Sequence, residues 1–535
     1  MVVARRLRIA VAQFDPHLGA IEANTDRLLT LHAEATAAGA DLLLTPALSV
    51  TGFPPEPLLC RPDLLRRREA ALERLAAATA GGRPGIVAGA PWRDAPAGSA
   101  RSAGSPVRGD APGGTGRDRD GSGSLVGSVF DAAFLLDGGE VRGRRLRHEF
   151  PPAALTDERR FLVAGPAPGP LSFRGIRLGL MVGADAASVA VAETLAESGA
   201  EILLGMEARP FLGRAATERR IDEAVPPVVE SGLPMLVAAG VGGQDGLVFA
   251  GGSFALDADR ALRWRLPLLR EALGITDWVE EGSGWRVLPH PLPSLPAEEA
   301  LWWEATGTAL LGHLRKNGFR GVLLPLSDRP ADLLLLLRAV EALGAEAVAA
   351  LRFAPPAAPE NRGEAMARGL GIAVRRRHAG LPGLDPAALE ALVLEGEAGA
   401  EGRLLLTGRS KTDLALGTGP AAGGFDLLAD LLDADLRALV RWRDPEGTLV
   451  PETSLATLVP DATDRRLRAM IEGGAGVDAP ARDGHEAAEV QRLWRALDRG
   501  AYKRRTAPPG LKLGPHAFGH DWRSPITNGS TTAFP

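Results

Sequence analysis

Short apolar runs separated by segments of helical spacing dominate the first half of the chain. Strand-forming residues fill positions 7–14, and apolar side chains then recur with the period of a helix up to Gly39. Further apolar runs predict strands at residues 42–45, 85–90, 130–136, 178–182, 202–205 and 235–239, and a helix at 189–198. This alternation predicts a layered α/β domain.

The second half of the chain repeats an order of helix, strand, helix and strand. A helix is predicted to end at Gly318, and strands are predicted at residues 321–326 and 347–351 on either side of a helix at 332–343. Strands that alternate with helices in this way pair in parallel and form a doubly wound sheet. A ligand of such a sheet binds at the carboxyl ends of the strands, so we expect the turn at 327–332 to face a ligand.

Two segments interrupt these patterns. Residues 97–127 are almost entirely Gly, Ser, Ala, Pro, Arg and Asp, a composition that buries too little apolar surface to offset the entropy of ordering, so we predict a disordered insertion. Residues 289–296 (PHPLPSLP) are proline-rich and predict a linker between a domain at 1–288 and a second domain at 297–535. The second domain ends in a tail at residues 500–530.

Charge is nearly balanced over the 535 residues. Lys and Arg total 61 against 66 Asp and Glu, without a basic block, so no nucleic-acid partner is expected. No apolar run reaches about 18 residues, so no membrane partner is expected either. Cys60 is the only cysteine, which excludes internal disulfides, favours a cytoplasmic location and predicts a small buried apolar side chain. The nine histidines lack metal-ligand spacing, so no metal site is predicted.

Six motifs, in order along the chain, carry a family resemblance. They are residues 51–59 (TGFPPEPLL), 157–161 (DERRF), 241–245 (VGGQD), 315–319 (RKNGF), 422–425 (AGGF) and 502–512 (YKRRTAPPGLK). Each resembles a motif of the glutamine-dependent NAD(+) synthetases. The resemblance implies an α/β chain with a nitrilase-like α-β-β-α sandwich of the carbon-nitrogen hydrolase type, followed by a Rossmann-like, doubly wound synthetase domain of the ATP-pyrophosphatase type.

The resemblance also implies a reaction. In this family the first domain releases ammonia from glutamine, and the second uses ATP and magnesium to adenylylate deamido-NAD before ammonia displaces AMP. The amidase site combines a Cys nucleophile, a Glu base and a Lys that stabilises the oxyanion. Aligned on the motifs, these three positions are Gly183, Ala47 and Arg147. Because glycine and alanine provide neither a nucleophile nor a base, we predict that the amidase activity is lost.

The ATP-binding turn differs from the family pattern as well. The family's S-G-G-x-D-S, whose glycines let backbone N–H groups approach phosphate, aligns with Ser327, Asp328, Arg329, Pro330, Ala331 and Asp332. Asp328 would repel phosphate, and Pro330 lacks an N–H. We therefore expect an ordinary helix start, capped by Asp328 or Asp332, with Arg329 as a remaining candidate phosphate ligand.

Two further sets of residues are candidates for nucleotide binding, and they are Lys411, Thr412, Asp413, Lys503, Arg504 and Arg505. The first set lies in a segment that resembles the family's L-T-T-G-N-K-S-E, but the metal-linked acidic residue expected after it is missing from 418–421. The second set lies in the tail, which in the family contributes to the dinucleotide site and to subunit packing. Sealing of the domain or of a dimer interface is the alternative role of this segment.

Together these differences predict a degenerate relative that keeps both folds and neither reaction centre. The first hypothesis is a regulatory or scaffolding subunit without a required cofactor, either a homo-oligomer or a hetero-oligomer with an active NAD synthetase paralogue. The second is a residual synthetase that makes NAD(+) from deamido-NAD with ATP and free ammonia. The third is a sensor that binds a dinucleotide through residues 503–505.

Overall fold

The computed structural model describes residues 5–93, 128–151, 158–282, 284–378, 385–419, 422–473, 487–527 and 529, and the insertion predicted at 97–127 lies outside them. The chain divides into two compact units, and the last change of unit falls between Ser294 and Leu295. Two early segments, Pro210–Thr217 and Gly243–Val248, belong to the second unit. Within the described ranges, no helix combines the length and apolarity needed to cross a membrane.

Two sheets form the first unit, with strand orders β15-β14-β1-β2-β3-β4-β5 and β13-β12-β9-β8-β7-β6. A separate pair consists of β10 and β11. The strands are β1 (Arg6–Gln13), β2 (Leu42–Leu44), β3 (Gly85–Arg93), β4 (Val129–Asp137), β5 (Glu140–Leu146), β6 (Leu171–Phe173), β7 (Ile176–Val182), β8 (Ile202–Glu207), β9 (Met235–Ala239), β10 (Val241–Gln244), β11 (Leu247–Ala250), β12 (Phe254–Leu256), β13 (Leu262–Arg265), β14 (Ala272–Glu281) and β15 (Gly284–Val287).

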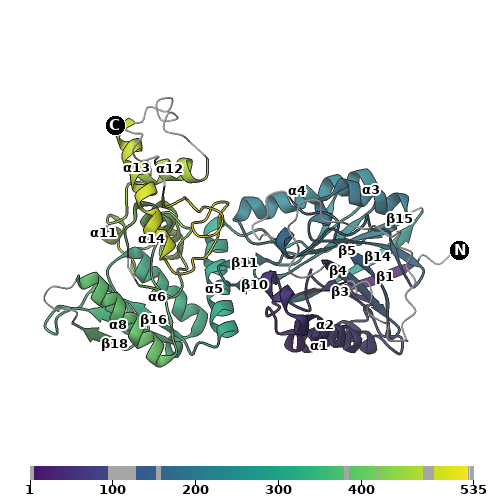
Figure 1. Cartoon of the computed structure of the whole chain (residues 1–535), viewed down its shortest axis with the longest axis horizontal. Coiled ribbons are helices and arrows are strands. Elements are labelled where there is room, and N and C mark those ends of the chain that lie inside the picture. Colours follow the sequence, from purple (N-terminus) through teal and green to yellow (C-terminus); the bar gives the residue numbers. More distant parts are fainter. Residues whose placement is uncertain are drawn as a thin grey trace. The chain divides into compact units, whose positions relative to one another are not determined.

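Helices cover the outer face of each sheet in this unit, as Figure 1 shows. Leu28 and Leu72 pack α1 and α2 against the first sheet, and Val191 and Val228 pack α3 and α4 against the second. Side chains from both sheets fill the layer between them. This arrangement confirms the predicted α-β-β-α sandwich. The helices are α1 (Ile21–Ala37), η1 (Glu56–Cys60), α2 (Pro62–Ala78), η2 (Glu158–Arg160), η3 (Gly183–Ala187), α3 (Val189–Glu197) and α4 (Arg214–Ser231).

The second unit contains a four-stranded parallel sheet with the order β18-β17-β16-β19. Its strands are β16 (Val322–Pro325), β17 (Val348–Phe353), β18 (Val374–Arg377) and β19 (Leu404–Leu405). Its helices are α5 (Glu298–Asn317), α6 (Pro330–Leu343), η4 (Ala345–Ala347), α7 (Arg362–Gly369), α8 (Pro386–Glu401), α9 (Lys411–Leu416), α10 (Asp433–Arg443), α11 (Glu452–Leu455), α12 (Asp461–Ile471), α13 (Ala487–Arg499) and α14 (Ala501–Arg505). The parallel sheet with helices between its strands confirms the predicted fold of this half.

Candidate functional site

In the first unit, Arg147 and Gly183 meet. Gly183 follows β7 and has a φ of +60°, while Arg147 follows β5. A Cβ atom added to Gly183 would lie 2.9 Å from Cζ and from Nε of Arg147, and 3.2 Å from its Nη1. All three separations are shorter than normal van der Waals contacts. The guanidinium therefore fills the volume into which any side chain at position 183 would project.

Arg147 is fixed in this place by several contacts. It is 4% exposed, and its Nη1 donates a hydrogen bond to Oε2 of Glu158 at 2.7 Å and lies 3.8 Å from Oδ2 of Asp131. Its Nε donates to the carbonyl oxygen of Glu149 at 2.9 Å, and its Cζ lies 4.2 Å from the ring centroid of Phe150. A buried ion pair of this kind is costly to break from one side, so the side chain is held firmly.

Several buried acidic side chains lie around the single guanidinium of Arg147. Asp131, Glu158 and Asp185 are all buried, and Asp185 accepts backbone N–H groups of His148 and Glu149. Burial raises the pKa of Asp131 to about 7 and also raises the pKa of Asp185. Asp131 was missed by the sequence analysis, although an aspartate inside the otherwise apolar run of β4 is a signal that could have identified it.

Ala47 lies in apolar surroundings. It is 4% exposed and packs in the layer between the sheets with Leu44, Val87 and Val182. The prediction of a buried Cys60 is wrong, because this side chain is exposed at the end of η1. The short helix buries the preceding Leu59 completely and turns Cys60 toward solvent. The single thiol of the chain is thus a surface group.

In the second unit, the turn at 327–332 leads from β16 into α6. The helix begins at Pro330 with Arg329 as its N-cap residue and no side-chain cap, so the predicted capping by Asp328 or Asp332 is wrong. Both carboxylates are used elsewhere. Asp328 accepts the backbone N–H of Arg362 at 2.8 Å, and Asp332 accepts the hydroxyl of Ser327 at 2.5 Å.

Arg329 is already paired with an acidic residue. Its Nη2 donates to Oδ2 of Asp413 at 2.5 Å, and Asp413 also completes the capping box of α9 with Ser410. Burial raises the pKa of Asp332 to about 6, and its Oδ1 has no hydrogen-bond partner among the described residues. A cavity of about 380 Å³ lies beside this turn, with Leu326, Phe353 and Asp332 in its wall.

These residues do not fit an ATP–magnesium complex. Pro330 has no N–H to offer a phosphate, and the carboxylates of Asp332 and Asp413 would repel one. The arginine between them is already paired. Across the described ranges, no group of three His, Cys, Asp or Glu side chains is arranged to hold a metal ion.

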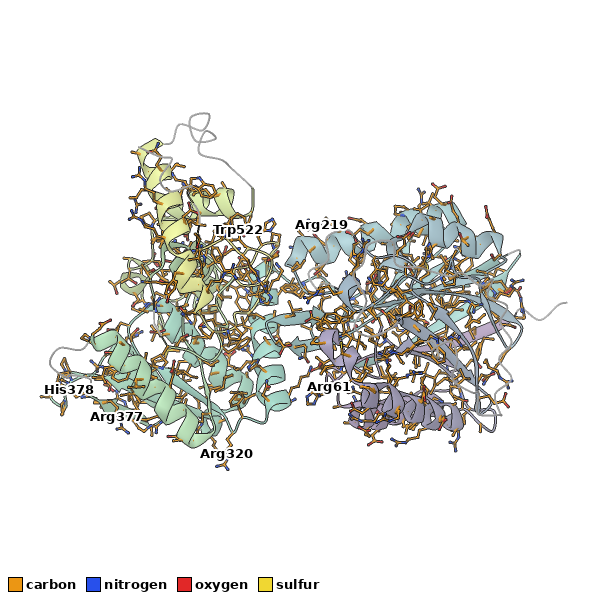
Figure 2. The ribbon with its side chains drawn as sticks, in the orientation of Figure 1. Arg61, Arg219, Arg320, Arg377, His378 and Trp522 are labelled. Carbon is orange, nitrogen blue, oxygen red and sulfur yellow. The ribbon has the colours of Figure 1, made fainter. Side chains whose placement is uncertain are left out.

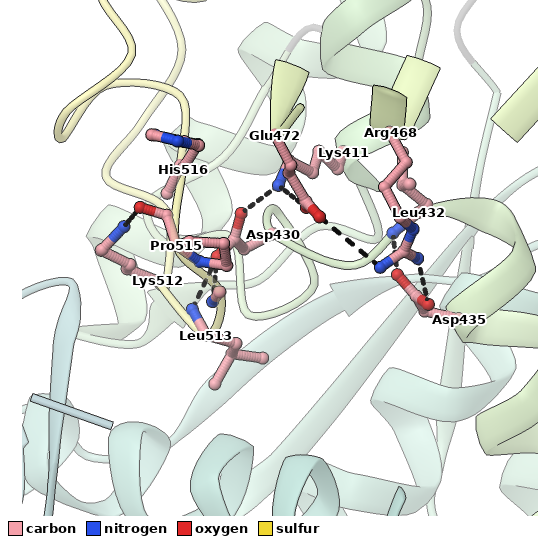
Figure 3. A network of polar contacts seen from close by, with 12 residues as sticks. Lys411, Asp430, Leu432, Asp435, Arg468, Glu472, Lys512, Leu513, Pro515 and His516 are labelled. Atoms are coloured by element: carbon pink, nitrogen blue, oxygen red, sulfur yellow. Dashed lines mark hydrogen bonds and ion pairs between the residues drawn. The ribbon is translucent and has the colours of Figure 1, made fainter. Parts of the chain in front are cut away.

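Lys411 is enclosed by carboxylates (Figure 3). It is 1% exposed, and its Nζ lies 3.0 Å from Oδ1 of Asp430 and 2.9 Å from Oε1 of Glu472. The other oxygen of Asp430 accepts the backbone N–H groups of Leu513 and Gly514 at 2.7 and 2.6 Å. The lysine therefore joins α9 to α12 and to the tail. Its neighbour Thr412 donates its hydroxyl to Asp464 at 2.7 Å.

The basic residues of the tail bind backbone carbonyls. Lys503 donates to Gly417 O at 2.7 Å, and Arg505 donates to Ser524 O at 3.4 Å. Arg504 donates to two carbonyls, at 3.1 Å and 2.6 Å. A cavity of about 440 Å³ beside them is lined by Arg504 and Arg505, and Lys503 is not part of its wall. The structure thus separates the three tail residues that the sequence grouped together.

The sandwich and the parallel sheet define the class of this protein. It combines a carbon-nitrogen hydrolase fold with a second α/β unit that is built on a parallel sheet. Residues 8–277 match the carbon-nitrogen hydrolase family. The chain is 30% identical to the glutamine-dependent NAD(+) synthetase of Xanthomonas campestris pv. campestris (strain 8004), over 99% of this chain and 98% of that protein. It is 29% identical to the synthetase of the same description from Rhodobacter capsulatus, over 98% of each. The chain belongs to the glutamine-dependent NAD(+) synthetase family.

Solved structures agree with this assignment. The glutamine-dependent NAD(+) synthetase of Acinetobacter baumannii, solved in complex with ADP, is 25% identical and superposes with a TM-score of 0.71, over 98% of this chain and 99% of that chain. The enzyme of Cytophaga hutchinsonii is 16% identical and superposes with a TM-score of 0.75 over 99% of both chains, which shows the same fold.

Proposed function

We propose that this chain is a non-catalytic member of its family that acts as a regulatory or scaffolding subunit of an active NAD synthetase. The observation that carries the proposal is the position of Arg147, whose guanidinium occupies the volume next to Gly183 where the family's nucleophile would project. An amide substrate has no nucleophile to meet there. Ala47, at the position of the family's base, lies in an apolar layer and has no group to accept a proton.

The second reaction centre supports the same proposal. Adenylylation needs phosphate-binding N–H groups and a bound metal, and the turn at 327–332 offers a proline and two carboxylates instead. Arg329 is the one cation of the turn, and its ion pair with Asp413 leaves it less available to bind a phosphate. These features disfavour a residual ammonia-dependent synthetase, which would still need this site.

The retained parts of the chain support a role in assembly. Both folds are complete, and charged side chains such as Lys411 are buried in ion pairs that stabilise the second unit and its tail. The tail motif at 502–512, to which the family resemblance assigns a part in subunit packing, is also present in this chain. The partner we propose is therefore an active synthetase of the same family from the same cell, or a second copy of this chain.

The test is to tag the chain at its own gene in the native host and to purify it at its native level. We expect a synthetase with intact Cys, Glu, Lys and S-G-G-x-D-S to co-purify, and the eluate to form NAD(+) from deamido-NAD, ATP, magnesium and glutamine. The same chain produced in a host without that partner is the matched control and should form none. Light scattering on this control material measures self-association.

The proposal fails if the chain elutes without any synthetase and is monomeric. It also fails if the genome of the host encodes no intact family member, because this chain would then have to supply the activity alone. Two results together would establish regulation. The partner should remain bound to the chain after a high-salt wash, and mixing the chain with the isolated partner should increase the rate at which the partner forms NAD(+).

A further inference from the structure

The cavity beside the turn at 327–332 has a largely apolar wall. It lies at the carboxyl ends of β16 and β17, next to α8. Its volume of about 380 Å³ falls within the range of about 300–1,000 Å³ that is typical of small-molecule sites. The ends of both strands and α8 supply apolar side chains to the wall, which are Pro325, Leu326, Phe353 and Leu394. The cavity can therefore hold a ligand with an apolar body.

The charged residues of this wall carry a net negative charge when they are ionised. Among the described residues that line the cavity, Asp332, Glu390 and Asp413 are acidic, and Arg329 is basic. Arg329 donates a hydrogen bond to Asp413 at 2.5 Å, so these two charges largely cancel. Asp332 and Glu390 remain. A ligand with a positive charge is therefore attracted to the cavity, and a phosphate is repelled.

Asp332 has one carboxylate oxygen that lacks a donor. The residue is 6% exposed, and its Oδ2 accepts the hydroxyl of Ser327 at 2.5 Å. Its Oδ1 is buried and has no hydrogen-bond partner among the described residues. Burial raises the pKa of Asp332 to about 6 despite the nearby Arg329. A ligand that brings N–H donors and a positive charge would offset this cost of burial.

Glu390 is a second carboxylate without a cation. It is half-buried on α8, and burial together with the nearby Asp385 raises its pKa, with no opposing positive charge in the part of the chain that the structure describes. Farther along the same helix, Glu397 pairs with Arg377 of β18, which Figure 2 labels. The helix thus neutralises the carboxylate that faces β18 and leaves unpaired the one that lines the cavity.

We propose that this cavity binds a small organic cation with an apolar body, such as an arylalkylammonium ion. The ammonium group would donate charge-assisted hydrogen bonds to Asp332 and Glu390. The body would pack against Leu326, Phe353 and Leu394, which separates this ligand from a bare inorganic cation. The charge of the ligand is the opposite of that of the nucleotide which the family resemblance places at this turn. The site does not depend on whether the chain assembles with a synthetase.

Titration calorimetry of the full chain with four probes tests the proposal. Phenethylammonium is the cation, 2-phenylethanol and phenylacetate are neutral and anionic compounds with a similar body, and methylammonium carries the charge without the ring. We expect phenethylammonium to bind at least about tenfold more tightly than each of the others, because hydrogen bonds between charged groups and burial of the apolar body each contribute a factor of about this size. Raising the salt concentration should weaken its binding.

Two variants each remove one carboxylate from the wall. Glu390→Gln and Asp332→Asn should both lower the affinity for phenethylammonium about tenfold or more. Asp332→Asn keeps an acceptor for the hydroxyl of Ser327, and Glu390 is only half-buried, so both variants should fold, which circular dichroism checks. Glu395→Gln is the matched control, because Glu395 is exposed on the same helix and is not part of the wall. Its affinity should be unchanged.

Four outcomes would overturn the proposal. They are absence of phenethylammonium binding at millimolar concentration, equal affinity for phenethylammonium and 2-phenylethanol, binding that Glu390→Gln and Asp332→Asn both leave unchanged, and displacement of the bound cation by ATP with magnesium. The last result would also count against a non-catalytic role, because it would show that the turn accepts the nucleotide. The first three would leave the proposed role in assembly unaffected, so the two proposals can fail separately.

Discussion

Substitution of Gly183 by alanine tests whether Arg147 really excludes a side chain from this position. The new Cβ would lie 2.9 Å from two atoms of the guanidinium, which would have to move away from its ion pair with Glu158. The φ of +60° adds a backbone cost of about 1–2 kcal/mol for a residue with a Cβ. Overpacking of a buried site costs about 1–3 kcal/mol more. We therefore expect Gly183→Ala to destabilise the first unit by about 2–5 kcal/mol.

Gly175→Ala is the matched control for the backbone cost. Gly175 lies between β6 and β7 with a φ of +84°, and nothing lies within 4 Å of a Cβ added there. We expect this variant to lose about 1–2 kcal/mol, so the difference between the two variants measures the collision with Arg147.

Native-state amide hydrogen exchange, measured by mass spectrometry in peptides of β4 and β7, is the suitable assay, because a chain of two units need not unfold in one two-state transition. A double variant that also carries Arg147→Met should show a smaller additional loss from Gly183→Ala than the single change shows. Equal destabilisation by Gly183→Ala and Gly175→Ala would refute the geometry at this site.

Three further predictions concern buried charge. Burial raises the pKa of Asp131 in the folded state to about 7. The contribution of Asp131 to stability is therefore greatest below pH about 4 and is lost as the pH rises to about 7. Asp131→Asn should remove this pH dependence, which amide hydrogen exchange in β4 between pH 4 and 8 would show. Lys411→Met leaves two carboxylates without their cation and should destabilise the second unit by about 3–5 kcal/mol in urea titrations, whereas Lys503→Met, at an exposed lysine, should cost under about 1 kcal/mol. Ala47→Glu restores the family's carboxylate in an apolar layer and should cost several kcal/mol in thermal unfolding, while Ala33→Glu on the exposed face of α1 should be nearly neutral.

The fold could be predicted from the sequence because its signals are local and periodic. The apolar runs at 85–90 and 235–239 correspond to β3 and β9, and the helix predicted to end at Gly318 is α5, which Gly318 terminates with a left-handed φ of +74°. Apolar alternation and a C-terminal glycine act within one element, so one sequence suffices to find them.

The sites could be predicted in part, because their residues depend on contacts between distant segments. Motif spacing placed Arg147 and Gly183 in one site. The side chains that enclose the guanidinium, Asp131 and Glu158, come from other segments, which no local sequence pattern connects to Arg147. The pairing of Arg329 with Asp413, 84 residues away, is of the same kind. The predicted caps at the start of α6 were wrong because both carboxylates have other partners, the distant Arg362 for Asp328 and the nearby Ser327 for Asp332.

The tail illustrates the same limit with a different result. Three consecutive basic residues predict one cationic patch, whereas the turn of a short helix directs Arg504 and Arg505 into a cavity and Lys503 toward Gly417. The third arginine of the cavity, Arg523, comes from a segment that no motif reasoning had selected. Side chains of equal charge thus reach different partners because of helix geometry.

The most direct test of the central claim is an assay of the purified full chain for NAD(+) formation. The reaction contains ATP, magnesium and deamido-NAD with either ammonium or glutamine, and the Rhodobacter capsulatus synthetase serves as the positive control. Because both reaction centres are altered, we expect no NAD(+) above background from either nitrogen source and no glutamate from glutamine. Turnover that co-elutes with the chain and disappears in its Arg329→Ala variant would contradict the proposal that the chain is non-catalytic.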